Sequence, residues 1–298
     1  MRSAIAASRG FAADLVSVFK PRIALFITAS ALGGTAASPG PWPEPGRLAL
    51  LALAVFFASA AAGAFNQLWE RELDARMRRT ARRPFACGRF RAGPLWYGSI
   101  LAILIASTGL AAGAANPWAA FYTLAGALVY ALLYTVWLKP RSRLNIVVGG
   151  LAGSFAVLAG AAAVDPALAP EPLLLALVLF LWTPPHFWAL AMATKEDYAG
   201  CGVPMLPVLV GDAVCARIVF AHALVLSLLA LLPAFFSMGP IYLAAALAGG
   251  LGFVSKARLL VRAPTRRNAI GVFSASLVQL ALLLAGTVAD RLLWTPDR

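Results

Sequence analysis

The sequence is poor in charged residues: Asp, Glu, Lys and Arg make up only 12% of its 298 residues, whereas 61% are hydrophobic and the mean hydropathy is +0.81. A soluble domain carries about 25% charged residues. This shortage excludes a soluble globular enzyme and a disordered chain, and it indicates a helical protein that crosses a membrane several times. Because short loops join such helices, we expect residues 1–298 to form a single transmembrane domain.

Cysteine and acidic residues are scarce as well. The three cysteines include no C-x-x-C pair, so the sequence predicts neither a disulfide framework nor a zinc site. Twelve acidic residues stand against 25 Lys and Arg, which gives a net charge of +13. Cytoplasmic loops of membrane proteins collect Lys and Arg, so we expect this charge to face a lipid bilayer and not nucleic acid. The first fifteen residues lack the apolar core of a signal peptide, and we expect the N-terminus to be retained.

Nine stretches are long and apolar enough to span a bilayer, which requires about 20 mostly apolar residues. They are rich in Ala and Leu and show no alternation, which excludes membrane strands. The expected fold is therefore an all-α polytopic membrane protein with nine transmembrane helices. The expected spans are 17–38, 48–68, 94–114, 117–137, 144–164, 171–192, 214–234, 239–257 and 269–289.

The distribution of Lys and Arg predicts the orientation of these helices. If the N-terminus is cytoplasmic, 22 of the 25 Lys and Arg lie on the cytoplasmic side, and only Arg47, Arg291 and Arg298 lie outside. We expect this orientation because positive charge marks the cytoplasmic side, and an odd number of spans then makes the C-terminus external. Two long cytoplasmic loops, 66–93 and 193–213, carry acids. They lie four helices apart, which suggests two helical repeats with a site between them.

Asn66, Glu70 and Asp74 follow one another at intervals of four residues at the start of the 66–93 loop. If the preceding helix continues through them, they line one face over about 12 Å. Their oxygens suit Mg²⁺, which takes one or two carboxylates and completes its shell with water and substrate phosphates. The arginines that follow could bind phosphate oxygens, or they could be ordinary cytoplasmic charges.

The segment 182–207 carries a Pro184–Pro185 pair inside an expected membrane helix, followed directly by His186. Such a pair interrupts the backbone hydrogen bonds and is tolerated where neighbours or a cavity satisfy the freed groups. His186 then either makes a structural hydrogen bond or contacts a substrate, and we predict the second. The rings of Trp188 and Tyr198 fit a substrate chamber and an interfacial aromatic belt equally well.

A third polar cluster surrounds the short 138–143 loop, where Lys139 and Arg143 stand between Tyr134 and Asn145. A diphosphate would bind such cations, but cytoplasmic charge explains them equally well, and Asn145 could simply cap a helix. The sequence has no P-loop, no G-x-G-x-x-G and no catalytic triad. It also lacks the charged network of a proton relay, which disfavours a transporter without excluding one.

The motifs resemble those of the UbiA-type intramembrane prenyltransferases, and in particular the branch that transfers a farnesyl group to haem. The resemblance spans nearly the whole chain, with the motifs in the family's order. Glu70 stands where this branch usually has Asp. The matching segments are Lys20-Pro21-Arg22, N-x₇-D-x₂-M-x-R-T-x₂-R-P at 66–84, Y-T-x₂-L-K at 134–139, N-I-V-x-G-G at 145–150, T-P-P-H-F-W-A-L-A at 183–191, and D-Y-x₃-G-x-P-M-L-P at 197–207.

This resemblance implies a UbiA-type helical bundle that transfers the farnesyl group of farnesyl diphosphate to a vinyl group of haem b, which makes haem O. It implies Mg²⁺ as the cofactor, with the ligands Asn66, Glu70, Asp74 and Asp197. It also implies that the leaving diphosphate is held by Arg83, Lys139 and Arg143. The residues expected to contact the substrates are Arg79, Thr80, Tyr134, Asn145, His186, Trp188 and Tyr198.

The resemblance further implies a bacterial inner-membrane protein whose active site faces the cytoplasm. A haem A synthase or a terminal oxidase is then a possible assembly partner. Three alternatives stay open at this point. One is a prenyltransferase of the same fold that acts on a quinone precursor or a chlorin, the second is a transporter of an anionic amphiphile, and the third is a haem-binding assembly protein without catalysis. A requirement for a divalent metal together with diphosphate release would separate the enzyme from the transporter.

Overall fold

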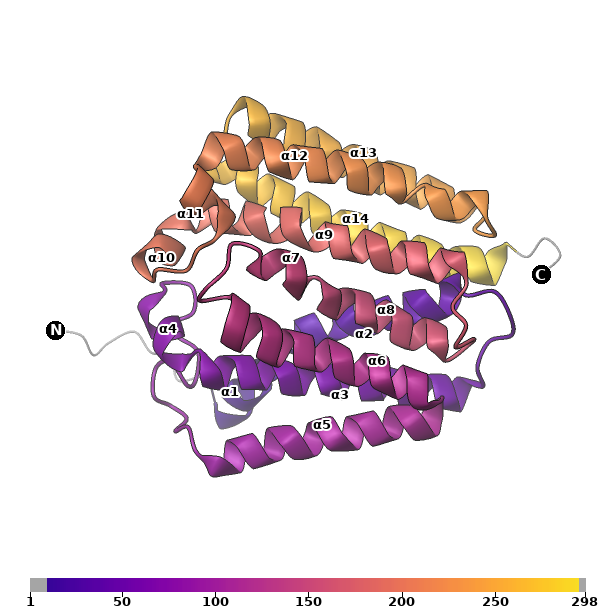
Figure 1. Cartoon of the computed structure of the whole chain (residues 1–298), viewed down its shortest axis with the longest axis horizontal. Coiled ribbons are helices and arrows are strands. Elements are labelled where there is room, and N and C mark those ends of the chain that lie inside the picture. Colours follow the sequence, from indigo (N-terminus) through magenta and orange to yellow (C-terminus); the bar gives the residue numbers. More distant parts are fainter. Residues whose placement is uncertain (1–9, 295–298) are drawn as a thin grey trace.

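A computed structural model describes residues 10–294, and in this part of the chain all regular structure is helical. Figure 1 shows the long helices lying side by side along one axis. Proline opens six of the long helices, because the first turn of a helix does not need the N–H that proline lacks. The elements are α1 (Phe11–Val18), α2 (Pro21–Ala37), α3 (Pro45–Trp69), α4 (Arg71–Arg76), α5 (Pro94–Ala114), α6 (Pro117–Leu128), η1 (Val129–Leu138), α7 (Asn145–Gly149), α8 (Leu151–Ala162), α9 (Pro170–Ala193), α10 (Lys195–Gly200), α11 (Leu206–Val210), α12 (Asp212–Leu229), η2 (Leu232–Phe235), α13 (Pro240–Arg262) and α14 (Arg266–Leu293).

Eight helical stretches within residues 10–294 are long and apolar enough to cross a membrane, and α1 with α2 makes a ninth if the bent pair is one span. These stretches coincide with the nine expected spans, so the all-α polytopic fold is confirmed. The first span is bent by 41°. At the bend Lys20 has a φ of 48°, in the left-handed region, and Pro21 then begins α2 without an N–H to continue α1.

The bundle has two ends of different chemistry. The motif end is where α3 runs into α4, with α10 and α11 beside it, at the left of Figure 1. The opposite end holds the beginnings of α3 and α9 and the end of α14. The predicted positions of the two chain termini fall on residues 1–9 and 295–298, which lie outside the described residues.

α9 lies at the centre of the bundle and contacts α2, α8, α12 and α14. Small residues bring α2 and α8 together beside it. A Cβ atom added to Gly160 would lie 1.8 Å from the carbonyl oxygen of Ala31, and one added to Gly34 would lie 2.0 Å from that of Val157. Close backbone approach of this kind is how membrane helices gain van der Waals contact, since apolar burial gives them little net attraction in lipid.

Two central segments depart from regular α-helical geometry. α9 runs unbroken through Pro184 and Pro185, so the expected interruption removes backbone donors without ending the helix. Gly150, at the junction of α7 and α8, packs against the carbonyl of Phe180, which Pro184 cannot bond. The span that begins with α6 finishes as the π-helix η1, whose hydrogen bonds close over five residues. π-helical segments are frequent at functional sites, and η1 leads to the motif end.

Candidate active site at the motif end

Asn66, Glu70 and Asp74 lie in line where α3 gives way to α4. The backbone N–H of Glu70 donates to the carbonyl of Asn66 at 2.9 Å, and that of Asp74 donates to the carbonyl of Glu70 at 2.7 Å. Helical hydrogen bonding therefore continues across the short break and keeps the three side chains on one face. All three are buried. Buried acids of this kind require partners.

Both carboxylates are paired with cations from other parts of the chain. The Lys139 ammonium, at the end of η1, donates to Glu70 Oε2 at 2.5 Å. The Arg83 guanidinium, in the loop after α4, donates to Asp74 Oδ2 at 2.6 Å. Breaking a buried ion pair by removing one partner costs about 3–5 kcal/mol, because the other charge stays buried. The two acids are therefore stable only while a cation is next to them.

Glu70 has a second carboxylate oxygen that is not satisfied. Its Oε1 is buried and has no hydrogen-bond partner among the described residues. Leaving a buried acceptor unpaired costs about 1–3 kcal/mol, and such atoms are rare in folded proteins. An orphaned carboxylate oxygen beside a second carboxylate is a place where a cation can bind.

Asn66 joins this line to two further elements. Its Oδ1 accepts a hydrogen bond from Lys20 Nζ at 2.5 Å, and Lys20 Nζ also donates to the hydroxyl of Tyr130 at 3.2 Å. Its Nδ2 donates to Thr135 Oγ1 at 2.9 Å. The bend before α2 and the π-helix η1 therefore meet at the first residue of the line.

Two tyrosine rings stand beside the cations. Tyr130 and Tyr134 stack with 5.7 Å between their centroids. Lys20 Nζ lies 5.7 Å from the centroid of Tyr130, and Lys139 Nζ lies 6.0 Å from that of Tyr134. A ring face attracts positive charge, so this pair of rings offers a surface that would also favour a carbocation.

The second acidic loop reaches the first. The backbone N–H of Arg79 donates to Asp197 Oδ2 at 3.4 Å. Arg78 and Glu196 lie 3.8 Å apart, but both are exposed, and such a pair contributes little. The firmer contact is apolar and joins residues of both loops. Its buried members are Met77, Ile146, Ala191, Tyr198, Val203 and Met205.

Two more of the predicted residues, Thr80 and Asn145, lie next to the line of acids or to its cation, and a third lies on the same turn as Asn145. Thr80 is buried and donates through Oγ1 to the carbonyl of Asp74 at 3.0 Å. Asn145 is buried and its Nδ2 donates to the carbonyl of Lys139 at 3.4 Å, so it braces the turn that carries that cation. Arg143 is exposed on the same turn. The structure therefore brings the first and third motifs together.

The two remaining predicted residues on α9 have other surroundings. His186 Nδ1 lies 2.7 Å from Ser276 Oγ of α14, and its ring is stacked between Trp182 and Phe273, at 4.2 and 4.5 Å between centroids. Trp188 is buried and packs against α12. Neither is bonded to the line of acids. Contact of these two residues with a substrate stays a prediction.

Sequence reasoning does not assign a role to Lys20, Tyr130 or Thr135. A signal for Lys20 exists, because it interrupts an apolar stretch and charges in membrane segments are usually functional. Thr135 lies inside the Y-T-x₂-L-K motif, which gives it no role by itself, and Tyr130 carries no signal, since hydroxyls are common in membrane helices. Only the tertiary packing shows that Thr135 meets Asn66 and that Tyr130 meets Lys20.

The donor set suits a hard divalent cation that arrives with a phosphate. Among residues 10–294, no group of three His, Cys, Asp or Glu side chains is placed to hold a metal ion. Mg²⁺ requires only one or two carboxylates when phosphate and water complete its shell. Asp74 and the orphaned oxygen of Glu70 meet that requirement, so the residues present fit Mg²⁺ bound together with a diphosphate.

A cysteine nucleophile is disfavoured at this end. Cys201 is partly buried, and that burial raises the pKa of its thiol. The charge of Asp197 acts in the same direction, whereas Arg76 and Lys139 oppose it. A thiol that stays protonated is a poor nucleophile.

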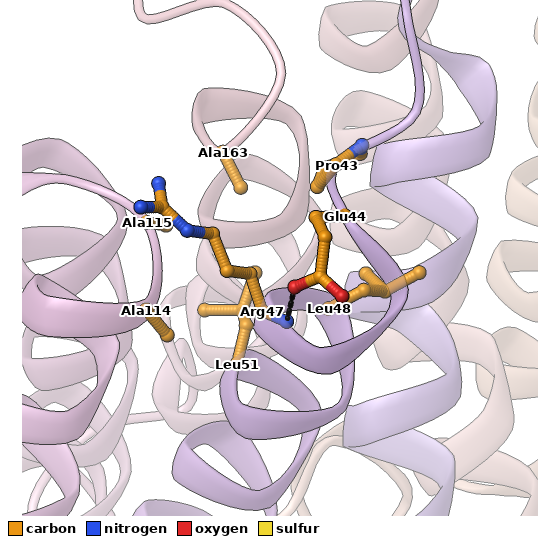
Figure 2. A pocket seen from close by; sticks show the side chains of 8 residues that line it. All are labelled: Pro43, Glu44, Arg47, Leu48, Leu51, Ala114, Ala115 and Ala163. Carbon is orange, nitrogen blue, oxygen red and sulfur yellow. Dashed lines mark hydrogen bonds between the residues drawn. The ribbon is translucent and has the colours of Figure 1, made fainter.

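A cavity of about 230 Å³ lies at the opposite end, between the beginning of α3 and the ends of α5 and α8. Figure 2 shows its two charged side chains, Glu44 and Arg47. The Glu44 carboxylate accepts the backbone N–H groups of Gly46 and Arg47, both at 3.0 Å, and these bonds lower the pKa of Glu44. Glu44 is a helix cap, and this cavity lacks the paired acids and cations of the motif end.

The sequence of this chain is similar to those of known proteins. The UbiA prenyltransferase family model matches residues 26–285. The protein named protoheme IX farnesyltransferase 2 of Paramagnetospirillum magneticum is 54% identical over 279 residues. The match covers 94% of this chain and 97% of that protein. Such identity over nearly the full length of both chains shows common descent.

Solved structures share the fold. A structure of a digeranylgeranylglyceryl phosphate synthase has a TM-score of 0.75 at 18% identity and covers 94% of this chain and 98% of its own. A UbiA homolog from Archaeoglobus fulgidus, bound to DMAPP and Mg²⁺, has a TM-score of 0.72 at 15% identity and covers 93% and 99%. Likeness at such low identity shows the fold alone. With the family model and the 54%-identical relative, it follows that the chain belongs to the UbiA prenyltransferase family.

Proposed function

We propose that this protein transfers the farnesyl group of farnesyl diphosphate to a vinyl group of haem b, which makes haem O and releases diphosphate. The observation that carries the proposal is the line of buried oxygens at the motif end. There Asn66, Glu70 and Asp74 each accept from a cation that another part of the chain supplies. The acceptor is taken from the 54%-identical relative, whose name specifies protoheme IX.

The reaction balances without an oxidant or a reductant. The bond between C1 of the farnesyl group and a diphosphate oxygen breaks, and its electron pair leaves with the diphosphate. The π-electrons of the vinyl group form the new carbon–carbon bond to C1. Water then adds to the other vinyl carbon and loses a proton, which leaves the hydroxyl group of haem O. Haem is a substrate here and not a redox cofactor.

Mg²⁺ would supply charge neutralisation for the leaving diphosphate. The residues that would hold it are Asn66, Glu70, Asp74 and Asp197. The orphaned Oε1 of Glu70 supports this assignment, because it is a buried acceptor that needs a positive partner. The homolog from Archaeoglobus fulgidus that was solved with DMAPP and Mg²⁺ also supports it.

The cations of the site would bind the diphosphate directly. Lys139 and Arg83 already lie against the two acids, and phosphate oxygens would give both cations further charged partners. We assign Arg79, Thr80 and Arg143 to the outer part of the same site. The stacked rings of Tyr130 and Tyr134 would face the allylic cation as the bond breaks and shelter it from water.

We assign the haem to the second motif, with the contacts His186, Trp188 and Tyr198, and to Asn145 of the third. His186 already bonds Ser276 and is stacked between two rings. Titration of purified His186→Gln with haem b tests its assignment. Weaker haem binding at an unchanged melting temperature supports contact. Unchanged binding at a lowered melting temperature means that His186 is structural.

The protein is an integral membrane protein, as its apolar helices show. We propose that residues 1–298 act as one domain in a bacterial inner membrane with the motif end in the cytoplasm, because 22 of 25 Lys and Arg would then lie inside. A reporter fused after Arg89 should read cytoplasmic, and one fused after Arg298 should read external. Reporters that read the same side contradict this orientation.

A haem A synthase or a terminal oxidase would be the partner that receives the product. This proposal follows from the chemistry, since haem O is apolar and gains nothing from release into water. Affinity purification of the full chain from membranes, followed by identification of the co-purified proteins, tests it. Recovery of neither kind of protein contradicts the partner and leaves the reaction untouched.

The proposed reaction is tested by comparing pigments from membranes with the wild-type protein, with Asp74→Asn and with no protein. Mass analysis should find haem in which one vinyl group has become a hydroxyethylfarnesyl group only with the wild type. Purified wild-type protein should then make it from farnesyl diphosphate, haem b and Mg²⁺, with one diphosphate released per product. A prenylated quinone precursor instead would show a different acceptor, and no product of either kind would contradict the enzyme.

A further inference from the structure

The orientation of the Asn66 side chain decides whether it can act as a ligand. An amide presents an oxygen on one side and an NH₂ group on the other, and only the oxygen can approach a cation. The two groups that flank the Asn66 amide allow only one orientation of it. Lys20 has an ammonium that only donates, and it lies 2.5 Å from the atom placed as Oδ1. The other side of the amide faces Thr135 Oγ1 at 2.9 Å.

The hydroxyl of Thr135 has its single hydrogen engaged elsewhere. It donates to the carbonyl of Tyr130 at 2.8 Å, so towards Asn66 it can only accept. Asn66 must therefore turn its NH₂ group to Thr135 and its carbonyl oxygen to the other side, where Lys20 Nζ donates to it. The Asn66 NH₂ group donates to Thr135, and the Thr135 hydroxyl donates to the carbonyl of Tyr130. This direction of hydrogen bonding does not depend on Lys20. The orientation would persist if Lys20 moved to a phosphate.

The π-helical register of η1 makes this possible. A hydroxyl in an α-helix bonds the carbonyl three or four residues back, as Thr123 of α6 does with Ala119 at 2.8 Å. Thr135 instead bonds Tyr130, five residues back. Because a π-helix takes in nearly one more residue per turn than the 3.6 of an α-helix, Thr135 stays close to the face of Tyr130.

The same register carries Lys139 to Glu70. Tyr130 and Lys139 are nine residues apart, which is about two and a half turns of an α-helix and would point them to opposite sides. The wider turns of η1 place both residues on the same side of the helix. There Tyr130 contacts Lys20, and Lys139 contacts Glu70. A regular α-helix at this position would allow only one of these two contacts.

We propose that Thr135 is a positioning residue that, through the π-helical register of η1, holds the Asn66 amide with its oxygen aimed at the metal and diphosphate site. This inference rests on the proposed function, because it assigns the Asn66 oxygen to a divalent cation. It concerns a residue that touches no reacting atom and acts through Asn66.

The test measures metal binding and does not depend on turnover. Mn²⁺ replaces Mg²⁺ as a probe, and its binding to the purified full chain is followed by electron paramagnetic resonance with inorganic diphosphate present. Thr135→Val keeps the shape and removes the hydroxyl, and we expect it to weaken Mn²⁺ binding by about 10- to 100-fold, as loss of a ligand's hydrogen-bond partner does. Thr135→Ser keeps the hydroxyl and should bind within about threefold of the wild type. Thr123→Val is the matched control, and it should leave Mn²⁺ binding unchanged.

A second pair of variants isolates orientation from all other effects. A carboxylate has oxygen on both sides, so Asn66→Asp has no orientation to fix. In the Asn66→Asp protein, Thr135→Val should therefore change Mn²⁺ binding by less than about threefold. The same large loss in both backgrounds would overturn the proposal. If Thr135→Val does not accumulate, Thr135→Ala makes the same comparison.

The outcomes separate the inference from the proposed function. Wild-type Mn²⁺ binding by Thr135→Val, with or without a lowered melting temperature, overturns the positioning role alone, provided that Asp74→Asn loses binding. A wild-type protein that binds no Mn²⁺ with diphosphate overturns the metal site and the positioning role together. A protein that binds Mn²⁺ as expected but makes no farnesylated haem overturns the proposed reaction and leaves Thr135 in its role.

Discussion

Buried acids occur at both ends of the bundle, and their partners differ. At the opposite end Asp290 is completely buried and accepts hydrogen bonds from backbone N–H groups. Its Oδ2 accepts the backbone N–H of Gly239 at 2.6 Å, and its Oδ1 accepts those of Ile241 and Tyr242 at 3.1 Å each. These groups are the free donors at the start of α13, so Asp290 ties the end of α14 to that helix.

At the motif end the partners are side chains. Glu70 and Asp74 accept from Lys139 and Arg83, and one oxygen of Glu70 has no partner among the described residues. A backbone donor cannot leave unless α13 unfolds, whereas a flexible cation can turn to a new anion. A buried acid that is held by backbone N–H groups is therefore structural, whereas one that is held by side-chain cations is available for chemistry.

The largest expected effect is the loss of activity in Asp74→Asn. The change removes one charge and almost no volume, and we expect turnover to fall by at least about 1,000-fold, as when a charge-stabilising group leaves an active site. Farnesylated haem per milligram of purified protein measures it. Glu72→Gln, an exposed acid on the same helix, is the control and should retain full activity. Activity near wild type in Asp74→Asn would place Asp74 with Asp290 among the structural acids.

Lys139→Met tests the pairing of the acids. It leaves Glu70 buried without its cation, and we expect a loss of about 3 kcal/mol in the free energy of unfolding. Chemical denaturation in detergent measures it. Adding Glu70→Leu should recover most of the stability and none of the activity, since both charges are then gone. Lys195→Met breaks the half-exposed pair with Asp212 and should cost less than about 1 kcal/mol. Equal costs for the two lysines would contradict the distinction.

Asp290→Asn probes the opposite end. The amide keeps one acceptor oxygen and loses the charge that faces three backbone donors, so we expect about 2 kcal/mol of destabilisation. Activity per folded molecule should stay at the wild-type level. The melting temperature and the specific activity of the purified variant measure both effects. Asp165→Asn, an exposed acid at the same end, serves as the control. A fall in specific activity at unchanged stability would show that this acid is more than structural.

Glu70→Asp has the smallest expected effect. The shorter side chain keeps the charge, and one methylene moves the carboxylate by about 1.5 Å, a shift that a loosely held Mg²⁺ shell accommodates. We expect activity within about tenfold of the wild type, whereas Glu70→Gln should approach Asp74→Asn. Steady-state rates at saturating farnesyl diphosphate measure both. Equal losses in Asp and Gln would show that the length of Glu70 is as important as its charge.

The chemistry of the motif end was partly predictable from the sequence. Asn66, Glu70 and Asp74 could be placed on one face because helical spacing is a local property, and the backbone hydrogen bonds through Glu70 keep that spacing. The two acidic loops suggested a shared site, but the particular contact of Asp197 with the backbone N–H of Arg79 was not predicted. The pairing of Lys139 with Glu70 could not be assigned, since these residues are 69 positions apart.

The sequence by itself determined the membrane spans, because a bilayer imposes a fixed length of apolar residues on each helix and requires each helix to satisfy its own backbone. The tertiary structure alone decided the partners of the acids. Lys20 reaches Asn66 only because the chain bends before Pro21, and Thr135 meets the same side chain only because η1 is wound as a π-helix. These contacts depend on the relative placement of helices, which hydrophobicity and spacing along one helix do not specify.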